Sequence, residues 1–547
     1  MKKIDNGFPI SRGNDVKING YAQKQNKYPN TDIILSSLLN FIKSKYSIPF
    51  YLSILMFFYM QTVKPMIIGD GHEYFAMTIS LFNHLSLDLR PVDITMRTAI
   101  EQASSISFPT TQDYYGYIKV FNGNYYPIHF WAYSLASLPI FVILHYLNFN
   151  ELSSLQIINA ILLLASLWVI TYCFDNKFQR LIMFVFSLVN PIVLYIGWTG
   201  GEVFSYSFVV MAISFAVAKK YNLAVLLSSI ASLQNPPIII FTLYLIYLGL
   251  RDSNFDLNKL KTLIPSSAIT VVPYIFCLMY CHVPNLIVSS GASSINYMSV
   301  SKFINLFTDL DFGMILYIPV LFILAVIALF IGVKKKDDRI VFLWITLALM
   351  VTITITQSNW NSGMIYINRY NTYMTPIVTL IVLYSIKYYS SILSMRFLGI
   401  TLIIGFVIAF FTISGCMHNL DGRSYLKFSK LSQDVIVCVP DLSNSPYENF
   451  GERSLGAEVD FRNNLPILFV YDGNVRKILT DYAHIADVEK FIEPQYKNET
   501  IENIKKSGLG YINSHEIIIP PQVDSGKIHI LYRSKDNMYT NKVPYPN

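Results

Sequence analysis

The sequence predicts an α-helical membrane protein of about eleven transmembrane helices, followed by a small, mostly β domain outside the membrane. Of the 547 residues, 53% are hydrophobic and only 14% are charged, a composition too apolar for a soluble protein of this size. Apolar runs long enough to cross a bilayer recur along the first three quarters of the chain and stop near Cys416. Residues 417–547 then carry 15 Lys and Arg against 17 Asp and Glu, which predicts a water-soluble domain.

The first 46 residues are polar, with eight Lys or Arg and three acidic residues. No small-residue cleavage site flanks the apolar run that follows them. We therefore expect residues 1–46 to form an uncleaved cytoplasmic arm that leads into the first span.

Runs of about 15 to 22 apolar residues match a hydrocarbon core of roughly 30 Å. The sequence predicts eleven such spans, near residues 47–65, 152–173, 180–197, 202–218, 221–234, 236–250, 262–283, 313–332, 339–356, 370–387 and 396–416. The segment 127–147 is a twelfth candidate. However, Pro127 and Pro139 bracket a short first half of it, and His129 and His145 lie within it.

The distribution of Lys and Arg favours eleven spans, because short loops rich in these residues stay in the cytoplasm. With a cytoplasmic N-terminus, every expected inner loop carries Lys or Arg, whereas the outer turns 197–202 and 234–237 carry none. We therefore expect 127–147 to be a juxtamembrane segment that dips into the outer face without crossing. The loop 66–126 and the domain 417–547 then lie on the extracytoplasmic side of the cytoplasmic membrane.

In the C-terminal domain, the runs "DVIVCVP", "LPILFVYDG" and "KIHILYR" are rich in β-branched residues and lie between turn-like residues. This pattern predicts short strands. The 47–416 region forms the transmembrane domain, and 417–547 forms the separate extracytoplasmic one.

Composition and motifs also exclude several functions. The formal net charge of +7 comes from short basic clusters beside apolar runs, so we expect membrane lipids and no nucleic acid as partners. No P-loop or GxGxxG follows a predicted strand and no soluble domain carries a DxD motif, which argues against a nucleotide-sugar donor. The five cysteines form no CxxC pair, and we expect no metal and no obligatory cofactor.

Five short motifs fall on the outer face under this topology. They are "GDGHEY" (69–74), "NGNYYPIHFWAYSLASLP" (122–139), "GWTGGEVFSY" (197–206), "LFTDLDFGMILYIP" (306–319) and "NWNSGMIYINRYNTYMTPIV" (359–378). Taken in order, they resemble the motifs of the GT-C superfamily of membrane glycosyltransferases, which includes protein O-mannosyltransferases and aminoarabinose transferases. The resemblance covers about residues 47–416. It departs from the mannosyltransferase pattern because two residues separate Asp70 from Glu73, and because His129 follows "YYPI".

The resemblance implies a GT-C-like enzyme that takes a sugar from a polyprenyl phosphate lipid on the outer face of the membrane. The acceptor is a cell-surface glycan, a lipid or a protein. Relatives in the mannosyl and aminoarabinose groups work without a metal, whereas the oligosaccharyltransferase branch uses a divalent ion. The alternative function is a transporter or flippase of lipid-linked sugars, although no internal repeat is apparent and the acids cluster at the outer face.

Asp70 and Glu73 are the expected catalytic residues. A sugar hydroxyl is a poor nucleophile, and a positioned carboxylate removes its proton during attack on the anomeric carbon. Asp70 is the preferred base, because Gly69 and Gly71 let the acceptor approach closely. Glu73 lies three residues further on and shares a helix face with Asp70, so it would assist. Which of the two is the base stays open.

Cations are expected to neutralise the leaving phosphate. Lys119 and Arg369 would bind it, Arg through a bidentate contact, and His129 would be a further donor. Glu202 follows Gly200 and Gly201 at the end of a span, where an acid is costly unless it is paired or faces a cavity. The residues expected to stack on sugar or isoprenoid are Tyr370, Trp360 and Tyr366.

Overall fold

The computed structural model describes residues 44–65, 67, 69–104, 112–361, 368–389, 395–417, 428–455, 460–471, 474–518, 529–533 and 539–540. All structural statements below concern these residues. Tyr366 and residues 1–43 of the predicted arm lie outside them.

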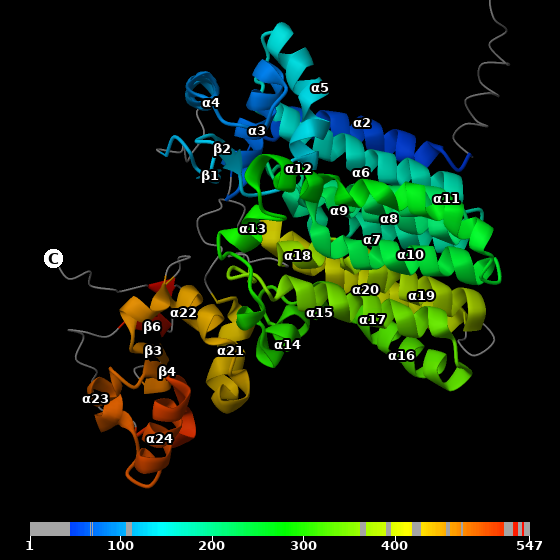
Figure 1. The fold of residues 1–547 in the computed structure, drawn as a ribbon. Coiled ribbons are helices and arrows are strands. Elements are labelled where there is room, and N and C mark those ends of the chain that lie inside the picture. Colours follow the sequence, from blue (N-terminus) through cyan, green and yellow to red (C-terminus); the bar gives the residue numbers. More distant parts are fainter. Residues whose placement is uncertain are drawn as a thin grey trace, which may run out of the picture.

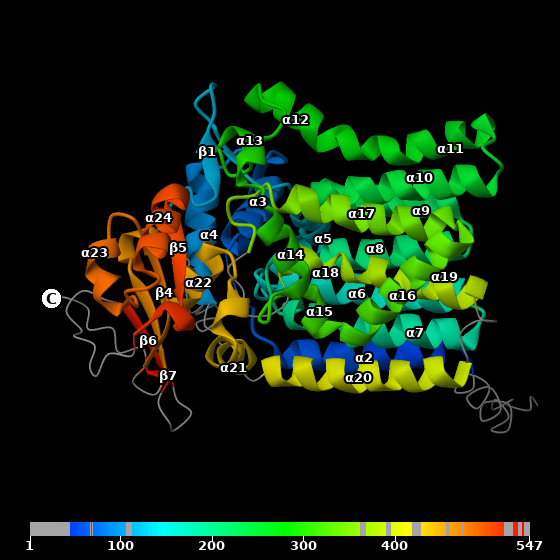
Figure 2. The ribbon, with the colours of Figure 1, turned by 90° about the horizontal axis from the view of Figure 1, so that it is seen from below.

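Most of the described chain is a bundle of helices that run side by side (Figures 1 and 2). These helices overlap all eleven predicted spans, and apolar side chains from most of them form one shared core. The helices are α2 (Ser47–Thr62), α6 (Ser153–Cys173), α7 (Lys177–Leu188), α8 (Glu202–Val217), α9 (Tyr221–Gln234), α10 (Ile239–Asp252), α11 (Leu257–Ser267), which continues through η3 (Ala268–Val271) into α12 (Val272–Cys281), α16 (Pro319–Lys335), α17 (Asp338–Thr354), α19 (Thr375–Tyr389) and α20 (Met395–Met417).

Two helices of the described chain are long and apolar enough to cross a membrane on their own. They are α6, with 21 residues, and the continuous helix Leu257–Cys281, with 25 residues. Several of the other helices are shorter: α9, for example, has 14 residues, which gives about 21 Å at 1.5 Å per residue. The count of eleven crossings therefore stays a prediction.

Helix breaks explain where the predicted spans and the observed helices differ. The span expected at 180–197 is a helix only to Leu188, because Asn190 and Pro191 start the separate 3₁₀ turn η1 (Pro191–Tyr195). Proline removes a backbone donor and favours the first position of a new helix. The span expected at 313–332 begins in the same way, at Pro319 after the short α15 (Met314–Tyr317).

Helix α8 lies inside the bundle and packs against α6, α9 and α19 (Figure 2). Thirteen of its side chains are buried, and they lie on all sides of the helix. A helix that is apolar all round belongs in the interior of a bundle. Because α8 begins at Glu202, it brings a carboxylate to one end of the bundle.

We call this end the pocket end, because the loops and short elements that build the candidate site gather there (Figure 1). The buried Asp93 holds two of its helices together, since its carboxylate accepts hydrogen bonds from Asn83, at 2.8 Å, and His84, at 2.9 Å. The elements at this end are α3 (Gly71–His84), α4 (Pro91–Ala103), β1 (Tyr117–Lys119), β2 (Tyr125–Pro127), α5 (Ala132–Tyr146), α13 (Leu286–Ser289), α14 (Val300–Thr308), α15 and α18 (Arg369–Thr372).

Most of the segment 127–147 forms helix α5, which begins at Ala132, after the β1–β2 hairpin. Figure 1 shows α5 beside α3 at the pocket end, at an angle to the long helices. It packs against α3 and α6. That it dips into the membrane without crossing remains a prediction.

The C-terminal part is a mixed α/β unit, and the prediction of a mostly β domain is too narrow. Its five-stranded sheet has the order β5-β4-β3-β6-β7, in which β3 and β6 are parallel and the other neighbours are antiparallel. The strands are β3 (Ile467–Tyr471), β4 (Asn474–Asp481), β5 (Leu509–Asn513), β6 (His529–Arg533) and β7 (Tyr539–Thr540), and the main helices are α21 (Lys430–Cys438), α22 (Tyr447–Leu455) and α24 (Lys497–Ser507).

Two of the three predicted strands are found, as β3 and β6. The run "DVIVCVP" instead lies mostly in helix α21, so that prediction is wrong. The side chain of Ser429 caps this helix by accepting a hydrogen bond from the Ser432 amide at 3.1 Å. A cap and the packing of one helix face outweigh the weak β preference of three valines and an isoleucine.

Candidate functional site

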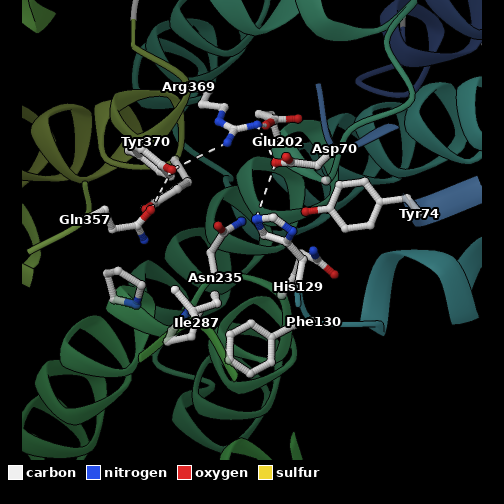
Figure 3. Close-up of a pocket in the computed structure, with 15 residues that line it drawn as sticks. Asp70, Tyr74, His129, Phe130, Glu202, Asn235, Ile287, Gln357, Arg369 and Tyr370 are labelled. Carbon is white, nitrogen blue, oxygen red and sulfur yellow. Dashed lines mark hydrogen bonds and ion pairs between the residues drawn. The ribbon is translucent and has the colours of Figure 1, made fainter. Parts of the chain in front are cut away.

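Asp70 lies at the start of helix α3, where it is the N-cap residue. Its carboxylate does not cap the helix and instead points toward Arg369 and His129 (Figure 3). The side chain is 20% exposed. The backbone of Asp70 is therefore fixed by the first turn of α3, while its carboxylate faces the pocket.

Arg369 lies between two carboxylates at the pocket end. Its Nη1 is 2.8 Å from Asp70 Oδ2 and 3.9 Å from Glu202 Oε1. Arg369 begins the short helix α18, and the Asn368 side chain caps that helix through the Tyr370 amide at 2.9 Å. The fold thus brings together three predicted site residues, Asp70, Glu202 and Arg369, that lie far apart in the sequence.

His129 connects Asp70 to a second acid. Its Nε2 is 3.5 Å from Asp70 Oδ2, and its Nδ1 is 2.6 Å from Glu73 Oε2. Glu73 also accepts a hydrogen bond from the His129 backbone amide at 2.7 Å. Because Glu73 is 1% exposed, it fixes the imidazole from behind, while Asp70 is the acid that faces the pocket.

The electrostatic balance follows from these contacts. Burial acts to raise the pKa of Asp70, but the Arg369 guanidinium and His129 outweigh it and lower the pKa to about 2. Burial acts to lower the pKa of His129, but Asp70 and Glu73 raise it to about 9. Burial raises the pKa of Glu73 despite the imidazole beside it. At neutral pH, the pocket therefore presents an ionised Asp70 and a cationic His129.

The pocket beside these residues has a cavity volume of about 50 Å³ and opens to solvent. Its wall combines aromatic rings with amide side chains, a combination suited to the faces and hydroxyl groups of a small polar ligand. Tyr370 donates a hydrogen bond to Gln357 at 2.7 Å, which fixes one part of the wall. The other lining side chains include Tyr74, Phe130, Gln234, Asn235, Ile287 and Tyr373.

Two polar atoms of the Arg369 cluster are buried without a hydrogen-bond partner among the described residues. They are Glu202 Oε2 and Arg369 Nε. Leaving a buried polar group unpaired costs roughly 1–3 kcal/mol, and more for a charged group. Unpaired polar atoms at the wall of a pocket are typical of a site in which a bound ligand supplies the missing hydrogen bonds.

Glycines let the acids take these positions. Gly116 has a positive φ of 77°, and a Cβ atom there would lie 2.5 Å from Glu73 Oε2. A Cβ atom at Gly200 would overlap the Glu202 carboxylate. The turn before β1, which passes behind Glu73, and the turn before α8 therefore both depend on the absence of a side chain.

The structure does not bring every predicted residue to this site. Lys119 is exposed at the end of β1 and does not line the pocket. Trp360 is fully buried and does not line it either. Asp70, His129, Glu202, Arg369 and Tyr370 do line it.

Sequence reasoning named five of the fifteen lining residues and missed the others, among them Tyr74, Asn235 and Gln357. Tyr74 belongs to the "GDGHEY" motif, and Asn235 belongs to the "QNPP" turn. Both the motif and the turn could therefore have pointed to these two residues. Gln357 follows a span and carries no local signal, because only the path of the chain places it beside Tyr370. In the described part of the chain, no group of three or more His, Cys, Asp or Glu residues is arranged to hold a metal ion.

Comparisons with known proteins give little beyond this geometry. No known protein family matches the sequence, and no curated protein matches it. Among solved structures, the chain is similar to the archaeal oligosaccharyltransferase AglB from Archaeoglobus fulgidus, in complex with an inhibitory peptide and a dolichol-phosphate. The identity is 10%, the match covers 88% of this chain and 75% of AglB, and the TM-score is 0.39. A TM-score of this size carries no argument, so the functional proposal rests on the site.

Proposed function

We propose that the protein is a membrane glycosyltransferase that moves a sugar from a polyprenyl phosphate donor to an acceptor hydroxyl on the extracytoplasmic side of the cytoplasmic membrane. The observation that carries the proposal is the shared guanidinium of Arg369, 2.8 Å from Asp70 in an open pocket. It places a carboxylate and a phosphate-binding cation side by side. Transfer from a phosphate donor needs both groups.

In the proposed reaction, the acceptor oxygen attacks the anomeric carbon of the donor sugar. The new bond joins the acceptor oxygen to that carbon, and the bond from the carbon to the phosphate oxygen breaks. Asp70 takes the proton of the acceptor hydroxyl, because its carboxylate lines the pocket while Glu73 lies behind His129. General-base assistance of this kind contributes roughly 10² to 10⁴ in rate.

The leaving polyprenyl phosphate keeps the electron pair of the broken bond and needs positive charge. Arg369 supplies a planar donor suited to bidentate phosphate contact. His129, whose pKa is raised to about 9, supplies a second cation. No nucleotide-binding element is required, because the donor is a lipid and its chain would lie along the apolar helices.

The ion pair between Asp70 and Arg369 gives the proposed reaction a built-in order. A carboxyl group with a pKa of about 2 is a weak base, since it holds a proton poorly. A donor phosphate that binds Arg369 would compete with Asp70 for the guanidinium and so raise the pKa of Asp70. The base would then become effective only after the donor has bound.

The acceptor stays a choice among a cell-surface glycan, a lipid and a protein. The aromatic and amide wall fits a sugar ring in each case, since rings stack on aromatic faces and hydroxyl groups pair with amides.

The test is a sugar-transfer assay on the purified full-length protein in lipid nanodiscs, with synthetic polyprenyl phosphates that carry radiolabelled sugars and a membrane extract as acceptor. We expect label to move from the lipid to the acceptor fraction, and we expect it to stay on the lipid with Asp70→Asn. Asp252→Asn is the matched control. Asp252 is the last residue of α10, at the end of the bundle away from the pocket, where it pairs with Lys219 and Arg251.

The same donors, reconstituted in liposomes, test the alternative of a flippase. Label that crosses the bilayer while it remains attached to the polyprenyl lipid would replace the transferase proposal with transport. Transfer without such movement would support it.

A further inference from the structure

The C-terminal domain contacts the helical part through helix α22, which lies against the pocket-end loops. Glu448 Oε1 is 3.0 Å from Lys302 Nζ. Asn361 donates hydrogen bonds to Glu452, at 2.6 Å, and to Asn449, at 3.2 Å. The contact is thus polar. The Lys302–Glu448 pair can be removed by mutation without changing the side chains of the other contacts.

Arg453 makes the most enclosed of these contacts. Its guanidinium donates to both carboxylate oxygens of Asp309, at 2.8 and 3.1 Å, and lies 3.0 Å from Asp311 Oδ2. The side chains are 6%, 3% and 0% exposed, respectively. One arginine from the C-terminal domain therefore contacts two buried acids of the turn after α14 and balances one of their two charges.

The same Asp309 shapes the turn itself. Its Oδ1 accepts hydrogen bonds from the backbone amides of Asp311, at 2.8 Å, and Phe312, at 3.2 Å. Side-chain bonds of this kind fix a turn locally. The direction of the Phe312 carbonyl group thus depends on the carboxylate that Arg453 holds.

That turn holds the helix that carries Arg369. The Phe312 carbonyl accepts a hydrogen bond from the Asn368 amide at 3.0 Å. The backbone carbonyl of Leu306, in α14, accepts a hydrogen bond from the Asn371 side chain at 2.7 Å. Both ends of the short helix α18 are therefore tied to the segment 306–312.

We propose that Arg453 is a positioning residue for Arg369: through Asp309, Phe312 and Asn368, the C-terminal domain holds α18 so that Arg369 meets the donor phosphate. This inference rests on the proposed function and gives the C-terminal domain a role in donor binding. Arg453 touches no part of the pocket around Asp70, so its effect travels through the turn.

Electrostatics explain why Arg453 would matter more than its neighbours on α22. Without its charge, two carboxylates in one buried turn repel each other. Burial already raises the pKa of the Asp311 carboxyl with Arg453 beside it. A weaker cation would therefore let the turn open, whereas loss of the Lys302–Glu448 pair leaves the turn intact.

The experiment compares Arg453→Lys with Glu448→Gln in the full-length protein in nanodiscs. The lysine keeps one charge but cannot reach both acids with a planar fork, so the protein stays folded while the turn loosens. Arg453→Gln is the more severe variant. Glu448→Gln breaks a contact of the same helix without touching the turn, which makes it the matched control.

Two measurements are made on each variant. Hydrogen exchange followed by mass spectrometry should show at least tenfold faster exchange of peptides that cover 309–313 and 368–372 in Arg453→Lys than in Glu448→Gln. Steady-state kinetics should show KM for the lipid donor raised about tenfold in Arg453→Lys, with KM for the acceptor unchanged.

Equal exchange in both variants, or equal loss toward donor and acceptor, would overturn the inference and leave α22 as an ordinary docking helix. The exchange measurement needs no activity. If the unmodified protein transfers no sugar while Arg453→Lys still loosens 368–372, the proposed function fails and the mechanical link from Arg453 to α18 stands.

Discussion

Arg369 in the pocket and Arg453 at the contact between the two domains are both arginines between two carboxylates, yet their surroundings differ. Arg453 reaches three carboxylate oxygens within 3.1 Å, and its side chain is 6% exposed. Arg369 has one acid at 2.8 Å and another at 3.9 Å, and its side chain is 17% exposed. One cluster is closed, and the other is open on the side of the pocket.

This difference separates a structural ion cluster from a candidate binding site more clearly than residue type does. Around Arg369, one carboxylate oxygen of Glu202 and the Nε atom of the arginine have no hydrogen-bond partner among the described residues. Around Arg453, Asp311 Oδ2 also lacks a hydrogen bond there, but it lies 3.0 Å from the guanidinium as an ion pair. In a site that only stabilises the fold, such atoms would be a net cost. The Arg369 cluster, whose unpaired atoms lie at the wall of a pocket, is the one that a phosphate and a sugar hydroxyl would complete.

The largest effect is expected at the open cluster. Asp70→Asn keeps the shape and polarity of the side chain but removes the charge that accepts a proton, so sugar transfer should fall by roughly 10² to 10⁴. Glu73→Gln should reduce transfer less, because Glu73 contacts His129 rather than the pocket. Single-turnover transfer and donor binding are measured on variants that elute as folded protein from gel filtration.

Donor binding by Asp70→Asn should survive. Normal transfer by Asp70→Asn together with an inactive Glu73→Gln would assign the base to Glu73. Normal transfer by both variants would reject a carboxylate base in this pocket.

The second prediction compares stability at the two arginines. Arg453→Gln leaves two buried carboxylates without their partner, and loss of one partner of a buried ion pair costs about 3–5 kcal/mol. Arg369→Gln should cost less than half of that, because water in the pocket can solvate Asp70, which is 20% exposed. Chemical unfolding of both variants in one detergent, followed by tryptophan fluorescence, measures the two losses.

Arg369→Gln should lose donor binding in spite of its milder effect on stability. Equal losses of stability at the two arginines would remove the distinction between a closed and an open cluster.

The elements of the pocket could be predicted from the sequence because their signals are local. Asp70, Glu202 and Arg369 each stand where an apolar run begins or ends, and a charge in that position requires a partner or a cavity. That they meet at one guanidinium could not be predicted, since the meeting depends on how α3, α8 and α18 converge. Lys119 shows the limit of local signals. Its charge and its place in the outer loop fit a phosphate-binding residue, but the β1–β2 hairpin leaves it exposed.

The contact between the domains was not predicted at all. Asp309 and Asp311 lie within the motif "LFTDLDFGMILYIP". Their partner Arg453 lies about 140 residues further on, in a helix of a domain that the sequence predicts to be mostly β. Asp309 and Asp311 are buried because α22 packs against their turn, and no periodicity in the sequence predicts this packing. Local patterns thus predicted the helices and the acids, whereas long-range pairing decided their roles.

The smallest expected effect concerns the pH dependence of donor binding, which separates His129 from the two arginines. Asp70, Glu73 and Arg369 surround this imidazole, and its pKa is raised from 6.5 to about 9. A raised pKa means that the ion pairs of His129 are fully formed below its ordinary pKa and are lost as the pH rises through about 9. The arginines keep their charge over this range.

Affinity for polyprenyl phosphate should therefore fall roughly tenfold between pH 8 and pH 10, the size expected for one charge-assisted hydrogen bond. Fluorescence titration with a dansylated lipid at several pH values measures this fall. His129→Gln should have weaker affinity at pH 8 and no such fall. Arg453→Lys should bind the lipid more weakly at every pH but keep the fall at the same pH, because it removes none of the charged groups around His129. A fall that persists in His129→Gln would assign the titration to another group and leave the imidazole with a purely structural role.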